Sequence, residues 1–349
     1  MAETKSVITE SKPVVVFDPF IRYIVTIIVS LLLAQIVCVF GIVANVINIK
    51  LFRKLGYQDG VNVTLTALAI NDLGALLSEL AFLNSGNPFI SELDVVVSKV
   101  ATGMISGYSQ EYFVRVSSAV TTFAALERCL CVTRPLKVKS MITTKKAVMV
   151  NLCLFLIYLA YLYVQFSYVY MDWTFLPERN RTVFMVFFTK MRTVMFPISY
   201  YVTEIIVPYL TFLILIVCSA ILFVKLKSKS KWRQSLSSSK DQLSSLTSKD
   251  RKTAMLFMTA SILCVVFLLP AHLLFTTAIF RRELALDGAL SDLSLMISSI
   301  TNFLKVLNSS LTIFIYYTMS TKYRNEFQLM VGRCRQWLGG QLEYTTSDI

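Results

Sequence analysis

The sequence predicts an all-α integral membrane protein, a seven-transmembrane helix bundle followed by a short amphipathic cytoplasmic helix. Three observations lead to this fold class. Of the 349 residues, 55% are hydrophobic and only 16% are charged, which leaves too few polar side chains to cover a soluble domain of this size. Seven apolar runs are long enough to cross a bilayer, and Lys and Arg gather on one side of them.

The expected spans follow from the thickness of the membrane. A hydrocarbon core of roughly 30 Å requires about 20 apolar residues in a helix. Runs of that length, bounded by polar clusters, occur at 23–52, 61–84, 98–131, 147–170, 198–225, 253–280 and 290–318. Pro208 and Pro270 lie inside the fifth and sixth runs. Neighbouring membrane helices can satisfy the carbonyls that proline frees, so we expect helix kinks there.

The orientation follows from the basic residues. Segments 50–60, 134–146, 225–252 and 322–335 contain 21 of the 34 Lys and Arg residues, so they are expected to be cytoplasmic. The chain then divides into an extracellular N-terminal tail (1–22), a membrane domain (23–318) with a third inside loop at about 226–252, and an amphipathic helix and cytoplasmic tail (319–349). The net charge of +13 therefore indicates contact with membrane lipid at the plasma membrane, and no nucleic acid partner is expected.

Two positions are candidates for covalent modification. The sequon Asn180-Arg181-Thr182 falls in the second outside loop, where N-glycosylation can occur. Cys334 lies among arginines beside the amphipathic segment, which is a typical setting for palmitoylation. The first 22 residues contain no apolar core ahead of a small-residue cleavage site, so we expect no cleavable signal peptide.

Several motifs in the spans point to one family. The first span contains Gly41-Ile42-Val43-Ala44-Asn45 and the second Leu68-Ala69-Ile70-Asn71-Asp72. The third ends on Leu126-Glu127-Arg128-Cys129, and Pro135 follows it. Over nearly the whole chain these motifs resemble those of the rhodopsin-like (class A) G-protein-coupled receptors. The sequence as a whole is most similar to those of divergent invertebrate chemosensory or neuropeptide-like receptors.

The resemblance implies that the chain binds an extracellular ligand and activates a heterotrimeric G protein, without enzyme activity or a cofactor. Glu127 and Arg128 would pair in the resting state, and Arg128 would be released towards the G protein. Pro135 and Tyr316 would complete the coupling and activation residues. The serine-rich inside loop near Arg233 could be a site for a receptor kinase and arrestin, through the charge that phosphate adds. The alternative is that this loop is only a solvated linker.

A buried polar network is expected in the middle of the membrane. Asn45, Asp72, Asn308 and Ser309 lie within apolar spans, where polar side chains are costly unless they find partners. The resemblance implies a sodium and water site at Asp72. A simple polar clamp between helices explains the same residues equally well.

The chain also departs from the family pattern. Leu268 stands where the family has a Trp before the proline of the sixth span, and Thr312 and Ile313 replace its Asn-Pro. Gly103 lies near the place of the family's third-span cysteine. These losses predict atypical activation mechanics.

Charged residues in the outer halves of the spans indicate a ligand pocket, because such residues usually face the bundle interior. They are Glu79, Glu111, Arg115, Glu204 and Lys305. Our candidates for the pocket are six residues: Glu79, Gln110, Glu111, Arg115, His272 and Lys305. A pocket with separate positive and negative groups suits a zwitterionic small molecule or a peptide. Glu111 and Arg115 share a helical face, and Lys305 could pair with Glu79 or Glu111. The alternative is a set of internal salt bridges that orient helices and touch no ligand.

Three other function classes find less support in the sequence. Lys305 invites comparison with the retinal lysine of an opsin-like photoreceptor, although the position counted back from Tyr316 is Val306. The intramembrane charges also allow a transporter or channel. An enzyme finds no support, because His272 is the only histidine and no metal-spaced cluster surrounds it.

Overall fold

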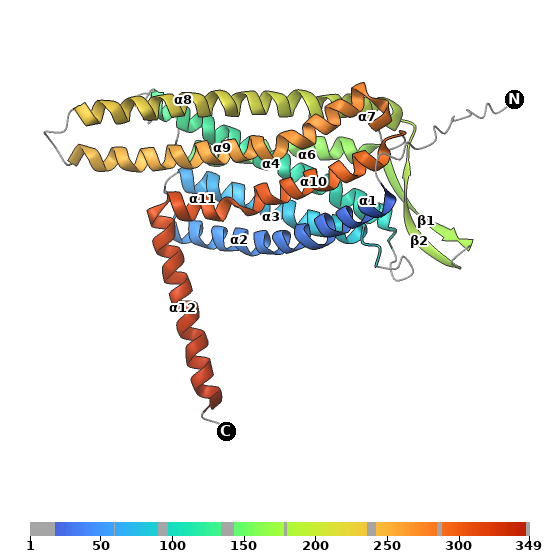
Figure 1. Ribbon diagram of the computed structural model, residues 1–349, viewed down its shortest axis with the longest axis horizontal. Coiled ribbons are helices and arrows are strands. Elements are labelled where there is room, and N and C mark those ends of the chain that lie inside the picture. Colours follow the sequence, from blue (N-terminus) through green and yellow to red (C-terminus); the bar gives the residue numbers. More distant parts are fainter. Residues whose placement is uncertain are drawn as a thin grey trace.

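Seven helical passes run side by side in the computed structural model of the protein (Figure 1). The structure describes residues 18–58, 60–89, 97–133, 143–177, 180–235, 242–284 and 288–346. Within these ranges, six helices are long and apolar enough to cross a membrane. The remaining pass is divided into two helices and carries more polar residues. The predicted helical membrane bundle is confirmed.

The first pass contains α1 (Pro19–Thr26), a π-helical stretch η1 (Ile27–Ala34) and α2 (Gln35–Leu55). The Asp18 side chain accepts a hydrogen bond from the Phe20 N–H at 2.8 Å, and Pro19 occupies the first helical position. Both residue types favour a helix start. The helix therefore begins before residue 23, inside the segment expected to be a tail. It ends at Gly56, whose φ of 81° is accessible to glycine.

The next three passes are α3 (Gly60–Ser85), α4 (Lys99–Thr133) and α6 (Thr144–Ser167). The Thr143 side chain caps α6 by accepting a hydrogen bond from the Lys146 N–H at 3.4 Å. The helix α4 packs along α3 and also contacts α6, α8 and α9. It is therefore the central element of the bundle.

The fifth pass combines α7 (Arg192–Tyr200), a second π-helical stretch η4 (Tyr201–Ile206) and α8 (Val207–Ser235). The sixth pass is α9 (Gln242–Phe280), which contains Pro270. Both α8 and α9 extend past the bundle (Figure 1), so helix occupies both ends of the predicted inside loop. Pro208 is the second residue of α8 and lies two residues after the end of the π-helical stretch.

The seventh pass comprises α10 (Ser291–Ser310) and α11 (Thr312–Met319), after the short 3-10 helix η5 (Arg282–Leu284). The final helix α12 (Thr321–Thr346) has 26 residues and is longer than the short helix that we expected. It leaves the bundle at a steep angle (Figure 1). That direction suits a helix lying along a membrane surface.

A β-hairpin between α6 and α7 was not predicted. Strands β1 (Val169–Leu176) and β2 (Arg181–Phe188) are antiparallel, with Tyr170 opposite Phe187 and Trp173 opposite Phe184. Both strands are rich in β-branched and aromatic residues, which favour strands, and our fourth span wrongly continued as helix to residue 170. The hairpin projects from one end of the bundle, and α12 starts at the other (Figure 1). We call these the hairpin end and the α12 end.

Candidate functional site

A cavity of about 170 Å³ lies inside the bundle near the hairpin end. It is formed by α4, α6, the fifth pass and α9. Five aromatic rings and two carboxylates dominate its wall. The lining residues are Tyr108, Glu111, Tyr161, Gln165, Phe196, Tyr200, Thr203, Glu204 and Phe275. An apolar cavity with a few convergent polar groups is the usual form of a small-ligand site.

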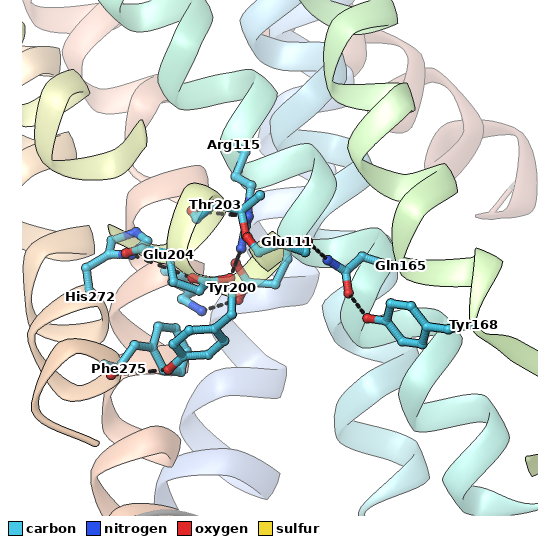
Figure 2. A network of polar contacts seen from close by, with 11 residues as sticks. Glu111, Arg115, Gln165, Tyr168, Tyr200, Thr203, Glu204, His272 and Phe275 are labelled. Atoms are coloured by element: carbon cyan, nitrogen blue, oxygen red, sulfur yellow. Dashed lines mark hydrogen bonds and ion pairs between the residues drawn. The ribbon is translucent and has the colours of Figure 1, made fainter. Parts of the chain in front are cut away.

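Arg115 organises the polar side of this cavity (Figure 2). Its guanidinium forms an ion pair with Glu204, lies 3.5 Å from a carboxylate oxygen of Glu111, and stacks 4.5 Å from the Tyr161 ring centre. The expected pairing of Glu111 with Arg115 is therefore present, but it is long. The closer partner of Arg115 is Glu204, from the fifth pass.

Lys305 forms its ion pair with Glu111 rather than with Glu79. Its ammonium also lies 5.6 Å from the centre of the Phe275 ring. Side-chain exposure is only 3% for Lys305 and 6% for Arg115. Both cations thus have carboxylate partners inside the protein, as the salt-bridge alternative anticipated. They line a second, smaller cavity of about 20 Å³ together with His272.

His272 holds the backbone of the fifth pass. Its Nδ1 atom lies 3.1 Å from the Glu204 carbonyl oxygen (Figure 2). Pro208 has no N–H, so the carbonyl four residues before it loses its α-helical donor. Because a carbonyl oxygen can only accept, Nδ1 of His272 is the donor. The structure therefore gives His272 a positioning contact at the cavity wall.

Two of the pocket candidates lie elsewhere. Gln110 and Glu79 are buried in α4 and α3 and line neither cavity. Glu79 is close enough to Lys305 and Glu111 to interact with them electrostatically. It therefore belongs to the charge balance of the site without contributing to its surface.

The predicted mid-membrane network is only partly connected. Asn45 Nδ2 donates to the carbonyl oxygens of Ser309, at 2.9 Å, and Gly41, at 3.0 Å. Ser117, which we had not predicted, donates to Asp72 at 2.7 Å. Within the described ranges, Asn308 makes no hydrogen bond to this group. Hydrogen bonds thus link α2 to α10 and α3 to α4.

The coupling residues lie at the α12 end. Arg128 Nη2 is 2.5 Å from Glu127 Oε1, and the guanidinium lies 5.8 Å from the Phe257 ring centre on α9. Tyr316 is buried and packs against Phe52, with ring centres 5.1 Å apart. Pro135 lies outside the described residues.

A bond absent from our predictions attaches α12 to the bundle. The Tyr323 hydroxyl donates to Asn48 Oδ1 at 2.5 Å, and Asn48 donates to Asn45 Oδ1 at 3.3 Å. Burial raises the pKa of Tyr323 above its usual range, so the hydroxyl keeps its proton at neutral pH. The chain of bonds connects α12 through α2 to the Ser309 carbonyl on α10.

The modification candidates differ in what the structure describes. Asn180 is exposed in the turn between β1 and β2, with a positive φ of 48°. That φ is less unfavourable for asparagine than for most residues. Cys334 belongs to α12, but its side chain lies outside the described set.

Sequence reasoning missed what Glu204 does. It counted this residue among the charged ones and assigned it no partner. The signal was Pro208 four residues later, which predicts a free carbonyl at Glu204. Tyr161, Tyr200 and Gln165 gave no such signal, because an aromatic or amide residue in an apolar run has no distinctive pattern.

Comparison with known proteins gives the family. An FMRFamide peptide receptor of Caenorhabditis elegans is 25% identical over 321 residues, which cover 86% of this chain and 68% of that receptor. The sequence profile of the serpentine type 7TM GPCR chemoreceptors of class Srw matches residues 32–334. Neither match favours an opsin, a transporter or an enzyme. The chain belongs to the Srw family of serpentine chemoreceptors, and is a multi-pass membrane receptor that binds an extracellular ligand and signals through a G protein.

Proposed function

We propose that the chain is a plasma-membrane receptor for a peptide, with the hairpin end outside the cell and the α12 end in the cytoplasm. The 21 basic residues in the four segments expected inside support this orientation. The name of the C. elegans relative, an FMRFamide peptide receptor, supports a peptide ligand. The cavity at the hairpin end would then face the extracellular side.

The observation that carries this proposal is the cavity itself. It combines aromatic rings, an amide and two carboxylates in a space of about 170 Å³. Water occupies about 30 Å³ per molecule in the liquid, so the space suits one or two side chains of a ligand. The remainder of a peptide would extend towards the hairpin.

G-protein coupling is proposed at the opposite end. The pairing of Glu127 with Arg128, and the contact of Arg128 with the Phe257 ring, tie the end of α4 to α9. Outward movement of α9 would weaken this contact and free Arg128 for the G protein. Such a pair is a local electrostatic switch with two states.

Asp72 is proposed to hold a sodium ion. Its Oδ2 atom is buried without a hydrogen-bond partner among the described residues. Ser117 donates to its other oxygen, and Ser309 supplies a further hydroxyl on α10, which packs against α3. A carboxylate with two hydroxyls fits a hard cation, which favours oxygen ligands. The ion would neutralise a charge that is costly inside a membrane.

Further contacts are proposed from position alone. The serine-rich segment between α8 and α9 would accept phosphate from a receptor kinase and then bind arrestin. The helix α12 would lie on lipid, with a palmitoyl group at Cys334 adding an anchor. Asn180, exposed at the hairpin turn, would carry the glycan.

The test is a signalling assay in cells that express promiscuous G-protein reporters. A pool of peptides, including FMRFamide, is applied to cells expressing the wild type or Arg128→Ala. We expect a response that Arg128→Ala abolishes at equal surface level. Arg53→Ala, which removes an exposed arginine at the same end, is the control and should respond normally. A receptor at the surface that responds to no peptide would contradict the proposal.

A further inference from the structure

One oxygen of the Glu204 carboxylate is unused. Oε1 pairs with Arg115, but Oε2 has no hydrogen-bond partner among the described residues. Nδ1 of His272 lies 3.7 Å from Oε2, and it donates instead to the Glu204 carbonyl. Buried polar atoms nearly always have partners, so an unused carboxylate oxygen requires an explanation.

The charges that face the cavity are both negative. Glu111 and Glu204 line it, whereas Arg115 and Lys305 line only the smaller cavity, which Glu111 also borders. The exposure of the side chains agrees with this division. It is 20% for Glu111 and 11% for Glu204, but only 6% for Arg115 and 3% for Lys305. An approaching ligand therefore meets carboxylates first.

The walls of the cavity suit a flat or soft cation. Besides the two carboxylates, the cavity is lined by five aromatic side chains, Tyr108, Tyr161, Phe196, Tyr200 and Phe275. Aromatic faces attract guanidinium and ammonium groups. Arg115 already stacks on Tyr161 in this way, so the site shows the geometry within its own structure.

We propose that this cavity takes a basic side chain of the peptide ligand, which donates a hydrogen bond to Oε2 of Glu204 and lies between the aromatic rings. The inference rests on the proposed function, because it assumes that the ligand enters at the hairpin end. Glu204 is then the residue that selects ligands for positive charge. Arg115 and His272 hold it in place through its Oε1 atom and its backbone carbonyl.

The first experiment compares two peptides on the wild-type receptor. FMRFamide is tested beside the analogue in which citrulline replaces arginine, a change that keeps the shape and removes the charge. Citrulline can still donate a hydrogen bond, but it loses the positive charge, and hydrogen bonds between charged groups are roughly twice as strong as neutral ones. The citrulline peptide should therefore be roughly tenfold less potent. Equal potency of the two peptides would overturn the proposal.

A pair of variants assigns the selectivity to Glu204. In Glu204→Gln the potency ratio between the two peptides should fall to within about threefold of one. Asp172→Asn removes an exposed carboxylate at the same end of the protein and should keep the wild-type ratio. The ratio does not depend on surface level. A Glu204→Gln receptor that keeps the full ratio would also overturn the proposal.

A binding measurement separates this inference from the proposed function. The purified receptor is heated with millimolar Arg-Phe-amide or citrulline-Phe-amide, and only the first should raise the unfolding temperature. If Arg-Phe-amide raises the unfolding temperature while no peptide produces a G-protein signal, the site for a basic group stands and the peptide-receptor proposal fails. If neither dipeptide raises the unfolding temperature while another peptide produces a signal, the receptor proposal stands and the site is refuted. This readout uses the wild type, so it remains decisive if Glu204→Gln does not fold.

Discussion

His272 on α9 donates a hydrogen bond to the backbone carbonyl of Glu204 in the fifth pass, with 3.1 Å between Nδ1 and the oxygen. Pro208 leaves that carbonyl without a helical donor. The preceding carbonyl, that of Thr203, also lacks its α-helical donor, because the Val207 N–H bonds the Val202 carbonyl in the π-helical stretch. It accepts a hydrogen bond from Arg115 Nη1 at 3.3 Å instead. Side chains from α9 and α4 thus satisfy the backbone where proline and the π-helical turn interrupt it.

We predict that His272→Ala lowers the free energy of unfolding by about 1–3 kcal/mol, because it leaves a buried carbonyl without a donor. His272→Asn should recover part of the loss, since its amide can donate. Thermal unfolding of the purified receptor measures both. Leu273→Ala, which shortens a neighbouring side chain exposed on the outer face of α9, is the matched control. An alanine variant as stable as the wild type would show that the bond contributes nothing.

We predict that Gly41→Ala destabilises the packing of α2 on α10. A Cβ atom at this position would lie 2.7 Å from Leu76 Cδ1 and 2.8 Å from Ser310 Cβ. Overpacking of this kind costs about 1–3 kcal/mol. Surface expression and unfolding temperature should both fall. Gly332→Ala is the control, because nothing lies within 4 Å of its added Cβ; equal behaviour of the two variants would refute the close approach.

We predict that Glu127→Gln raises signalling in the absence of ligand. The substitution removes the charge that holds Arg128 in a largely buried pair. If the pair contributes about 1.5 kcal/mol to the resting state, the active fraction should rise about tenfold while it remains small. Glu326→Gln breaks the more exposed pair with Lys54 at the same end and should leave basal signalling unchanged. Basal activity that does not rise would indicate that the pair is no part of the switch.

We predict that Tyr323→Phe loosens α12, because it removes the hydrogen bond to Asn48 while keeping the ring. The loss should be about 1 kcal/mol and should appear as faster amide hydrogen exchange in the first turns of α12. Tyr317→Phe removes a more exposed hydroxyl with a long bond of 3.5 Å to Gln328 and should not change the exchange. The double variant Asn48→Ala with Tyr323→Phe should exchange the amide hydrogens of these turns no faster than Asn48→Ala alone, because both changes remove the same bond.

Much of the fold could be predicted because it depends on length and polarity. Each predicted span coincides with a helical pass, and most of the predicted ends lie within a few residues of the observed ones. The reason is that lipid demands a continuous run of apolar residues with internal hydrogen bonds. The hairpin was missed because short apolar runs in a loop do not distinguish strand from helix. The extensions of α8 and α9 lie in polar sequence, where membrane thickness places no limit on a helix.

The candidate site was predicted less completely, because charge inside a span shows that a residue needs a partner but not which one. Lys305 had two possible partners in the sequence. Its side chain pairs with Glu111 on α4, although α10 packs against α3, the helix that carries Glu79. Arg115 shares a helical face with Glu111, yet the closer approach of Glu204 from another helix determines its main ion pair.

By itself the sequence determined that this protein is a bundle of membrane helices with basic residues concentrated in four of its connecting and terminal segments, because hydropathy and charge are local properties of the chain. Only the tertiary structure decided which carboxylate each buried cation meets, and that His272 and Arg115 satisfy the carbonyls around Pro208. Those contacts join residues that lie far apart in the chain. The sequence of one helix does not show which side chain of another helix will pack against it.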